Sequence, residues 1–509
     1  MNINWNLLNI NKINLKSKKI LFLGYGAVAK CVLNYFNYYF EFDLTKVYII
    51  DKYEKVFYGP EQDQVPKSNK IVAKIQCENF DDYIDKIKLR KNDLIIDLTF
   101  DTNTYYFIKK CLDLDINYMN TSIEDGNDEL AGSSIAYQHF HMREIYDEVK
   151  AKKKIGCNIL LECGQNPGLI QHYVIFALNE LNKKKHPNAK DIWELSKLKH
   201  VINDYMIGTI LFSEIDYMYK TKDIYDTNSD ILYNTWSAAG MLSEGLDSTE
   251  LTYSRKNKYY KPQIPNKVVN KEKISLLENL TAKSKLPYNV LFLNEIGLNS
   301  NLNSICPALD SKGNLFYENF EGKLIHHDEM FDIAEELGQD APLMTYVYKM
   351  NKYAEYSLQK IMRKSNHITP DDLTLRINSF NEKFLVFDNI NVKPADKLIG
   401  WDSVGCTIYC GKKNIDSIYW CGSLLSSSDP NVMEIFTPTI VQVAAGVLSG
   451  ISYIMEPENK NKGLLKPTDL YTPYILSKAV PLLGKFFFCE IPVKDFSKGG
   501  IKFEVDRLV

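Results

Sequence analysis

The chain has 509 residues, 45% of them hydrophobic and 25% charged, with a net charge of −3. This is the composition of an ordinary globular protein of two or more domains, without the basic excess of a nucleic-acid-binding protein. The 10 cysteines form no Cys-x-x-Cys pair, which argues against a zinc site or a disulfide framework. Residues 1–19 lack the pattern of a signal peptide, and the apolar stretch 440–455 is too short and interrupted to span a bilayer. We therefore expect a cytoplasmic protein with no metal site and no nucleic-acid or membrane partner.

The first elements have the order of a dinucleotide-binding unit. An apolar run at residues 20–23 ends in Gly24-Tyr-Gly26-Ala27-Val28-Ala29 and passes into a helical pattern, and the next apolar run, 47–50, ends on Asp51. In such units the first glycine makes the turn, the second lets backbone approach the pyrophosphate, and the acid binds the ribose hydroxyls. Because a carboxylate would repel a 2′-phosphate, Asp51 favours NAD over NADP.

Strand and helix patterns alternate up to about residue 160. Strands are predicted at 20–23, 47–50, 71–75, 94–98, 118–121 and 159–161, with helices at 27–40 and 104–112 among those between them. Regular alternation predicts an α/β fold, a Rossmann doubly wound parallel sheet covered on both faces. Ligands of such sheets bind at the carboxyl ends of the strands. The expected cofactor residues are therefore Gly24, Gly26, Ala27, Val28, Asp51, Thr99, Asp101, Thr102, Thr121, Asn166 and Pro167.

The rhythm changes after residue 166. A helix is predicted at 169–181, a lysine-rich, mobile insertion at 256–285, strands at 404–410 and 417–421, a tightly packed buried helix at 439–455, and a strand at 486–491. This mixture predicts a second α+β domain built on a sheet. We expect domains at 1–165 and 166–435, and a C-terminal helix and tail at 436–509 that partly packs back on the first domain.

Two further segments carry candidate chemistry. Asn166-Pro167-Gly168 follows a predicted strand, and this tripeptide is either a plain turn or part of a site. Trp236 lies among small and polar residues, with Glu244 about two helical turns later. A tryptophan in an apolar setting is usually a core residue, but these neighbours leave room beside the ring for a ligand.

Several motifs, in order, identify a family. They are Gly24-Tyr-Gly26 with Asp51, Asp97-Leu-Thr-Phe-Asp101-Thr102, Asn120-Thr-Ser-Ile-Glu124, Gly164-Gln-Asn166-Pro167-Gly168, Ser213-Glu214-Ile-Asp216, Asn234-Thr-Trp236-Ser-x-x-Gly240-x-x-Ser-Glu244-Gly245, and the segments 404–409 and 419–426. Through them the chain resembles the bacterial-type NAD-dependent homospermidine synthases, relatives of the saccharopine dehydrogenases, over nearly its full length.

This resemblance implies an NAD-dependent aminobutyl transfer without net oxidation. Two putrescines, or spermidine plus putrescine, would give homospermidine with release of ammonia or 1,3-diaminopropane. The resemblance also implies a homodimer, formed through the second domain. Among the matching positions, Glu214 and Glu244 would hold ammonium groups, and Glu124 would do the same or move protons. Asn166 would orient the amine or the nicotinamide carboxamide, and Trp236 would stack on the cationic intermediate.

One departure concerns a His-Asn-Glu tripeptide that the family carries in an apolar strand. Here Leu293 stands where histidine is expected, followed by Asn294 and Glu295. His326-His327 lies about 30 residues further on, and at most one of these adjacent histidines faces a given side of a strand. One histidine of this pair is a candidate substitute for the missing one, but the favoured interpretation is that the pair lies in a surface loop.

Two other functions stay open. An oxidoreductase of the saccharopine or carboxyspermidine dehydrogenase type would transfer hydride with net oxidation, but its carboxylate substrates call for Arg or Lys in the pocket. The motifs here offer glutamates and a tryptophan instead, which favours a polycationic substrate. A non-catalytic NAD-binding protein is the other alternative, and Leu293 gives it some support.

Overall fold

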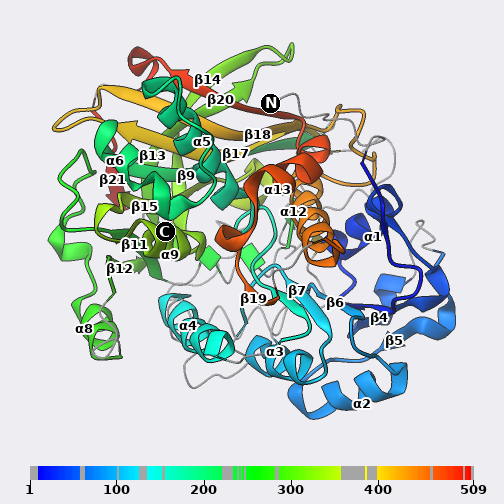
Figure 1. The fold of residues 1–509 in the computed structure, drawn as a ribbon. Helices are drawn as coiled ribbons and strands as arrows, with labels where there is room; N and C mark the ends of the chain where they lie inside the picture. The colour runs from blue at the N-terminus through cyan, green and yellow to red at the C-terminus, as the bar shows by residue number, and fades with distance from the viewer. Residues whose placement is uncertain are drawn as a thin grey trace, which may run out of the picture. The chain divides into compact units, whose positions relative to one another are not determined.

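The computed structural model describes residues 10–57, 64–99, 102–124, 135–151, 155–220, 233–237, 240–241, 244–245, 248–280, 286–356, 385–386, 398–458, 462–496 and 499–505. The chain forms two compact units (Figure 1). The first consists of residues 1–133, 137–172 and 440–483, and the second of residues 134–136, 173–439 and 484–509. One unit holds a parallel sheet and the other a mixed sheet, so the predicted α/β fold class is confirmed.

The first unit is built on a seven-stranded sheet in the order β19-β8-β7-β6-β2-β4-β5, in which all neighbours are parallel. The strands are β2 (Ile20–Leu23), β4 (Val47–Asp51), β5 (Lys70–Val72), β6 (Leu94–Asp97), β7 (Asn117–Asn120), β8 (Asn158–Leu160) and β19 (Gly463–Leu465). A short parallel pair, β1 (Ile13–Asn14) and β3 (Phe40–Glu41), lies outside this sheet. Strands buried on both faces read as continuous apolar runs, which is why the sequence revealed them.

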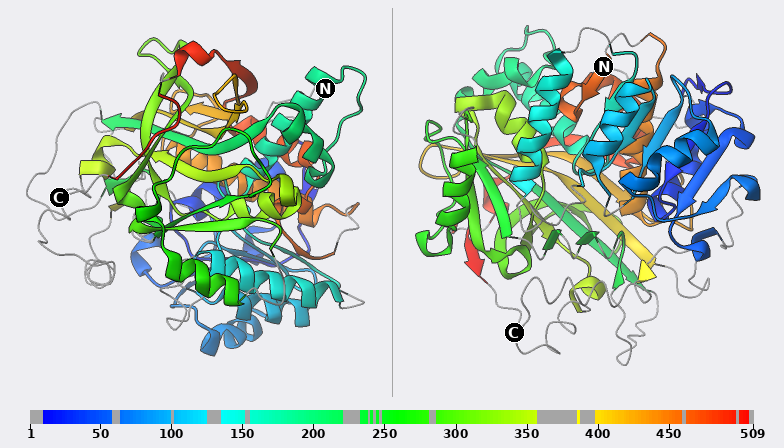
Figure 2. Two further views of the ribbon diagram at one scale, coloured as in Figure 1. Left: turned by 90° about the vertical axis from the view of Figure 1, so that its left-hand side faces the viewer. Right: turned by 90° about the horizontal axis from the view of Figure 1, so that it is seen from below.

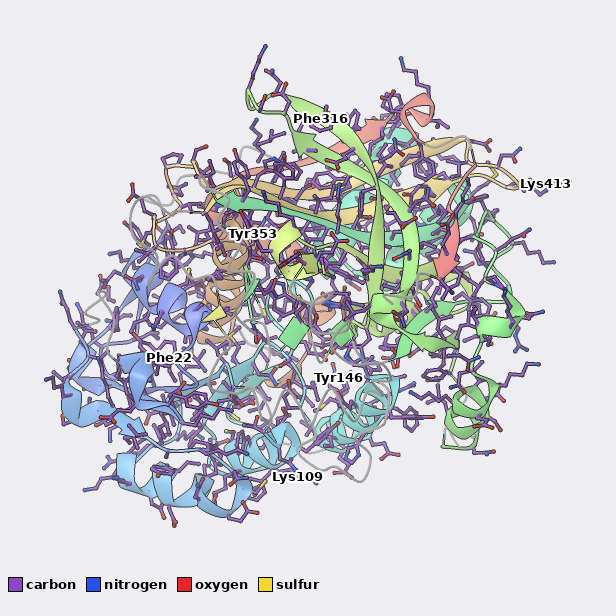
Figure 3. The ribbon with its side chains drawn as sticks, turned by 180° about the vertical axis from the view of Figure 1, so that it is seen from behind. Phe22, Lys109, Tyr146, Phe316, Tyr353 and Lys413 are labelled. Atoms are coloured by element: carbon purple, nitrogen blue, oxygen red, sulfur yellow. The ribbon has the colours of Figure 1, made fainter. Side chains whose placement is uncertain are left out.

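Helices cover both faces of this sheet (Figure 2). The helices of the unit are α1 (Ala27–Tyr39), α2 (Cys77–Ile87), α3 (Thr104–Asp113), α4 (Ile135–Ala151), the start of α5 (Leu169–Lys185), α12 (Pro438–Met455) and α13 (Thr472–Ala479). Leu21 and Leu23 of β2 share an apolar cluster with residues of α2, α3 and α4. The side chain of Phe22 (Figure 3) points to the opposite face of the sheet, where its ring lies 6.2 Å from the Phe36 ring of α1, measured between centroids. The alternation along β2 thus assigns one layer of helices to each face.

Helix α12 packs closely against the turn after β8. A Cβ on Gly446 would lie 2.0 Å from the Gly164 carbonyl oxygen, and one on Gly450 would lie 2.5 Å from the Cys163 sulfur. The helix has the length and mean hydropathy, 1.4, of a membrane span, but 89% of that window is buried within the protein. Its small residues therefore serve the close packing that the sequence predicted for a core helix.

The second unit is built on a ten-stranded mixed sheet in the order β20-β18-β17-β9-β15-β14-β13-β21, with β11 pairing β12 and β15. Only the β9–β15 pair is parallel among these neighbours. The strands are β9 (Ile207–Lys220), β11 (Ser248–Tyr253), β12 (Asn289–Ile296), β13 (Ser300–Leu309), β14 (Leu315–Ile325), β15 (Leu343–Lys349), β17 (Leu398–Cys410), β18 (Ser417–Ser426), β20 (Lys485–Ile491) and β21 (Phe503–Val505). The described part of this unit also contains the pair β10 (Tyr233–Asn234) and β16 (Leu385–Val386), and the helices α6 (Lys199–Asp204), α8 (Lys271–Leu280) and α9 (Glu329–Leu337).

The C-terminal residues divide between the two units. Residues 440–483, with α12, β19 and α13, belong to the first unit, whereas β20 and β21 pair with strands of the second. The N-terminal part of the first unit ends at residue 172, and residues 440–483 join that unit. The predicted insertion at 256–285 contains helix α8 within its described part.

Candidate functional site

The carboxyl ends of β2 and β6 form the centre of a candidate nucleotide site. These strands are neighbours, while the chain after β2 leads through α1 to β4 on the other side. The strand order therefore reverses at this point, where doubly wound sheets bind their ligands. Gly24 follows β2 with φ of +78°, and a Cβ there would lie 2.7 Å from the Leu98 carbonyl oxygen after β6. Glycine is required by both the backbone angle and the close approach.

Gly26, unlike the crowded Gly24, lies in open space. It caps the N-terminus of α1, and a Cβ built on it would meet no atom of the described chain within 4 Å. Ala27 and Val28 begin the helix itself. Backbone N–H groups at a helix start lack partners within the helix and attract anions. The space at Gly26 and the helix start are therefore consistent with a phosphate approaching here.

Asp51 stands at the end of β4, next to this turn. Its Oδ2 accepts a hydrogen bond from the Tyr25 backbone N–H at 2.7 Å, and its Oδ1 accepts one from the Tyr53 N–H at 2.7 Å. The carboxylate is thereby held against the glycine turn. Each oxygen keeps a further lone pair, so the group remains able to accept bonds from ribose hydroxyls.

The loop after β6 carries a hydroxyl network. Asp97 is buried and accepts hydrogen bonds from the Tyr118 hydroxyl at 2.7 Å and from the Thr99 N–H at 3.1 Å. Burial raises the pKa of Asp97, while these hydrogen bonds lower it. The Thr99 and Thr102 hydroxyls lie 3.2 Å apart, within hydrogen-bonding distance. Asp101, which was also predicted for the cofactor, lies outside the described residues.

Two more strand ends complete this edge. After β7, where Thr121 follows the strand, the Glu124 backbone N–H donates to the Thr104 hydroxyl at 2.9 Å and its carboxylate accepts from Ser122 at 3.1 Å. After β8, Asn166 and Pro167 are joined by a cis peptide in a turn closed by a 2.9 Å bond from the Gly164 N–H to the Pro167 carbonyl. The described cofactor candidates, together with Glu124, thus follow carboxyl ends of strands in one sheet.

The second unit holds a cluster of buried carboxyl groups, which we call the acid cluster: Glu214, Asp216 and Asp402. Glu214 and Asp216 alternate with Leu211 and Ile215 along β9, and the latter pair faces an apolar cluster. The carboxyl groups therefore share the opposite face. Asp402 of β17 is paired in register with Asp216, which places all three on that face.

Hydroxyl and amide groups hold the acid cluster. Tyr346 of β15 donates to Glu214. Asp216 accepts hydrogen bonds from Thr235, from Asn351 at 2.9 Å and from Tyr348 at 3.4 Å, and Asp402 accepts one from Thr439. The Trp236 indole N–H donates to the Tyr348 hydroxyl at 3.3 Å. These contacts bring the predicted residues Glu214 and Trp236 into one network, together with residues that were not predicted.

Burial decides the protonation of this cluster. The pKa of Glu214 is raised to about 8. Burial is the largest cause and the charges of Asp216 and Glu244 add to it, while the Tyr346 hydroxyl and His327 oppose the shift. Burial likewise raises the pKa of Asp216 to about 6, against its three hydrogen bonds. The pKa of Asp402 is raised well above its ordinary value by burial and by the two neighbouring carboxyl groups. At neutral pH the cluster therefore carries less negative charge than three exposed carboxylates would.

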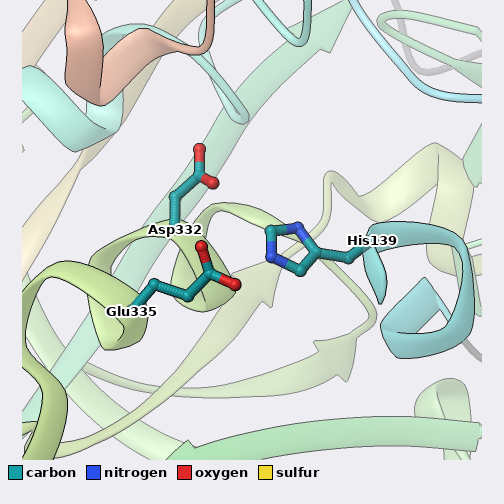
Figure 4. Close-up of side chains that lie close together, drawn as sticks. All are labelled: His139, Asp332 and Glu335. Atoms are coloured by element: carbon teal, nitrogen blue, oxygen red, sulfur yellow. The ribbon is translucent and has the colours of Figure 1, made fainter. Parts of the chain in front are cut away.

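Glu244, the other predicted carboxylate of the second unit, pairs with His327. The Nε2 atom of His327 lies 3.4 Å from Glu244, and its Nδ1 lies 3.2 Å from Glu329, at the start of α9. The imidazole is 95% buried, since 5% of its side chain is exposed, and it stacks on the Tyr346 ring at 4.1 Å. The expectation of a surface loop was wrong, because this connection between β14 and α9 turns inward. Two more acids of α9, Asp332 and Glu335, are drawn in Figure 4.

Two other sequence interpretations change. Gly240 packs against the Trp236 ring, with a Cβ there only 2.9 Å from the indole, so part of the space beside the ring is filled by backbone. Leu293 is fully buried in the apolar cluster of the unit, and Asn294 is exposed and bonds backbone carbonyls. The position expected to carry histidine is thus a core position here.

The raised pKa of Glu214 predicts a stability change with pH. Because the folded-state pKa exceeds the unfolded one, the stabilisation is complete below about pH 4.5 and is lost as the pH rises towards 8. The unfolding free energy of the wild-type protein should therefore decrease between pH 5 and 8.5. In Glu214→Gln this decrease should be smaller by several kcal/mol, at about 1.4 kcal/mol per pKa unit. Urea denaturation at both pH values measures it.

The exposed Glu194, paired with Lys197, supplies a control for that experiment. Glu194→Gln should leave the pH dependence as in the wild-type protein, since an exposed pair contributes little. Equal slopes for the wild-type protein and Glu214→Gln would show that Glu214 is ionised throughout this range, contrary to the buried, protonated state described above.

Known proteins are similar to this chain at two levels, one domain and nearly the whole chain. Residues 20–155 match the family described as saccharopine dehydrogenase NADP binding domain. The homospermidine synthase of Mesorhizobium japonicum is 22% identical over 513 residues, covering 96% of this chain and 94% of that protein. The homospermidine synthase of Blastochloris viridis is 21% identical, covering 91% and 89%.

A solved structure has the same fold. The homospermidine synthase of Legionella pneumophila, crystallised in complex with NAD, superposes with a TM-score of 0.70 at 20% identity, covering 94% of this chain and 92% of that one. The predicted resemblance is thereby confirmed. The chain is similar to homospermidine synthases along nearly its whole length, and its residues 20–155 match the saccharopine dehydrogenase NADP binding domain.

Proposed function

We propose that the protein is a homospermidine synthase that uses NAD to transfer an aminobutyl group between polyamines. The observation that carries this proposal is the acid cluster beside Trp236. A polyamine is a string of ammonium groups on an apolar chain, and it requires buried anions and an aromatic face. Saccharopine-type substrates carry carboxylates, which a cluster of three carboxyl groups would repel. The similarity to three homospermidine synthases supports the same assignment.

The nucleotide would lie at the carboxyl edge of the parallel sheet. Gly24 and Gly26 provide the close approach, the start of α1 would face the pyrophosphate, and Asp51 would bind the ribose. Bound there, NAD supplies a hydride acceptor for the carbon beside an amine and afterwards a hydride donor, so the overall reaction involves no net oxidation. Asn166 would orient the amine or the nicotinamide, and Glu124 would lie at the same edge.

The polyamine would be held by residues of the second unit. Glu214 and Glu244 would each take an ammonium group, and the Trp236 ring would stack on the cation. A cation beside Glu214 would stabilise its ionised form and lower its raised pKa, so substrate binding and carboxyl ionisation are linked. We also infer a homodimer in the cytoplasm, without nucleic-acid or membrane partners, on the basis of the resemblance.

The nucleotide preference follows from Asp51. We expect NAD to bind about tenfold or more tightly than NADP, a difference of about 1.4 kcal/mol, because the carboxylate repels a 2′-phosphate. Asp51→Asn should narrow this difference, and Asp85→Asn, at an exposed position of α2, should not. Calorimetric titration measures both affinities. Tighter binding of NADP by the wild-type protein would contradict the proposed role of Asp51.

The reaction itself is tested by incubating the full-length protein with putrescine and NAD and analysing the products by mass spectrometry. We expect homospermidine and ammonia, with no accumulation of NADH at 340 nm. Accumulating NADH would instead indicate the second candidate function, a saccharopine dehydrogenase-type oxidoreductase. The family matched by residues 20–155 is the observation that favours this alternative. Bound NAD without turnover of any diamine would indicate a nucleotide-binding protein that is not an enzyme.

The same assay tests Trp236. A desolvated cation–π contact contributes about 2 kcal/mol, so Trp236→Ala should lower kcat/KM for putrescine about 30-fold and leave NAD affinity unchanged. Trp193→Ala is the matched control, because Trp193 also belongs to the second unit and packs on Phe176 at 6.2 Å. Equal losses in the two variants would remove Trp236 from the site.

A further inference from the structure

A pocket of about 610 Å³ lies within the first unit, between β1, the turn after α12 and the start of α13. This volume is typical of a site for a small molecule. Its lining includes three tyrosines and two glutamates: Tyr453, Tyr471, Tyr474, Glu456 and Glu458. Aromatic faces next to carboxylates are the surroundings that favour an organic ammonium group.

The pocket and the candidate nucleotide site lie at opposite edges of the parallel sheet. Asn158, at the start of β8, donates to the Ile454 carbonyl at 2.7 Å, so the last turn of α12 lies at the amino edge. Helix α1 gives the same placement. It begins beside Gly26, runs for 13 residues, and is followed by β3, which pairs with β1 of the pocket. A helix of that length spans about 20 Å, so a ligand in the pocket would not touch the nucleotide.

The tyrosine rings present aromatic faces in different directions. Tyr453 and Tyr474 lie edge to face, with centroids 5.6 Å apart and ring planes at 79°. The Tyr474 hydroxyl hydrogen-bonds the Glu456 carboxylate at 2.9 Å, which fixes this ring next to an anion. Tyr471, which precedes α13, is 51% exposed although its ring is large and apolar. An exposed aromatic ring in a pocket lining is available to a ligand.

The charges of the lining favour a cation. Glu456 and Glu458 follow the C-terminal end of α12, where the helix carbonyl groups carry partial negative charge. Lys12, which is exposed, supplies one positive charge against these two carboxylates. The Lys478 ammonium group lies 5.4 Å from the centre of the Tyr474 ring. The protein's own lysine therefore already uses one of these rings as a partner for an ammonium group.

We propose that this pocket binds a linear polyamine outside the reaction centre. Glu456 and Glu458, one residue apart, match a ligand with at least two ammonium groups, and Ile13 and Pro457 offer apolar surface to the methylene groups between them. The inference goes beyond the proposed function, because it depends on the residues of the pocket alone. Since β1 forms one side of the pocket and α12 and α13 form the other, a bound polyamine would connect these elements.

Hydrogen–deuterium exchange of the full-length protein without NAD, measured by mass spectrometry, tests the location. Spermidine is the probe, at a concentration that saturates its binding in calorimetry. We expect slower exchange in the peptides that contain residues 10–14 and 453–458. Spermidine bound at the acid cluster alone would slow exchange along β9 and leave these peptides unchanged. That result, or no binding of spermidine at all, would overturn the proposal.

Removal of the two carboxylates tests the charge requirement. The double variant Glu456→Gln, Glu458→Gln should weaken spermidine binding in the pocket about tenfold and remove most of the protection, measured where the wild-type protein is half protected. The double variant Glu78→Gln, Asp82→Asn is the matched control, because it removes the same charge from exposed positions of α2 in the same unit. Equal protection of the pocket peptides in all three proteins would overturn the proposal.

Tyr471 keeps the proposal testable if the glutamate variant fails to fold, because its side chain is half exposed. Tyr471→Phe, which keeps the ring, should retain the affinity, and Tyr471→Leu should lower it about two- to fivefold. Equal affinities of these two variants would overturn the proposal. Homospermidine formation is a separate measurement: its absence from the wild-type reaction would overturn the proposed function, whereas protection of residues 10–14 would still support the pocket.

Discussion

The removal of three carboxyl groups from water on one face of a sheet is the constraint on which the proposed substrate site depends. Burial favours the protonated form, and it raises the pKa of Glu214 to about 8 and that of Asp216 to about 6. Such a cluster is tolerated only where other groups supply hydrogen bonds, and tyrosine, threonine and asparagine side chains do so here. In the proposed function, a polyamine would bring a further positive charge to the cluster, next to the Trp236 ring.

The register of the strands creates this arrangement. Pairing of β17 with β9 sets Asp402 opposite Asp216, and pairing of β15 with β9 places Tyr346 and Tyr348 on the same face as Glu214. Because successive side chains alternate between faces, a shift of one residue in either pairing would exchange carboxyl groups for apolar residues of the core. The chemistry of this unit is thus a consequence of sheet geometry, whereas in the first unit it follows from loops at strand ends.

This difference explains which features could be predicted from the sequence. Gly24, Gly26 and Asp51 were recognisable because turn geometry and strand ends are local properties of the chain, and β2 has the predicted bounds. Glu214 and Asp216 alternate within one motif, so their common face was also implied by the sequence, although Asp216 was not assigned a role. Asp402 and Tyr346 join them across more than a hundred residues, and no local pattern specifies that pairing. His327 follows a strand in a short connection, which resembles a surface loop until the carboxylates on either side of it are known.

The central claim is that Glu214 of the acid cluster is largely protonated without substrate and ionises when a diamine binds. Calorimetric titration of the NAD-bound protein with putrescine at pH 7, in buffers of different ionisation enthalpy, tests it most directly. A cation beside Glu214 lowers the carboxyl pKa, so the account predicts net proton release and a binding heat that varies with the buffer. Diamine binding with the same heat in every buffer would contradict it.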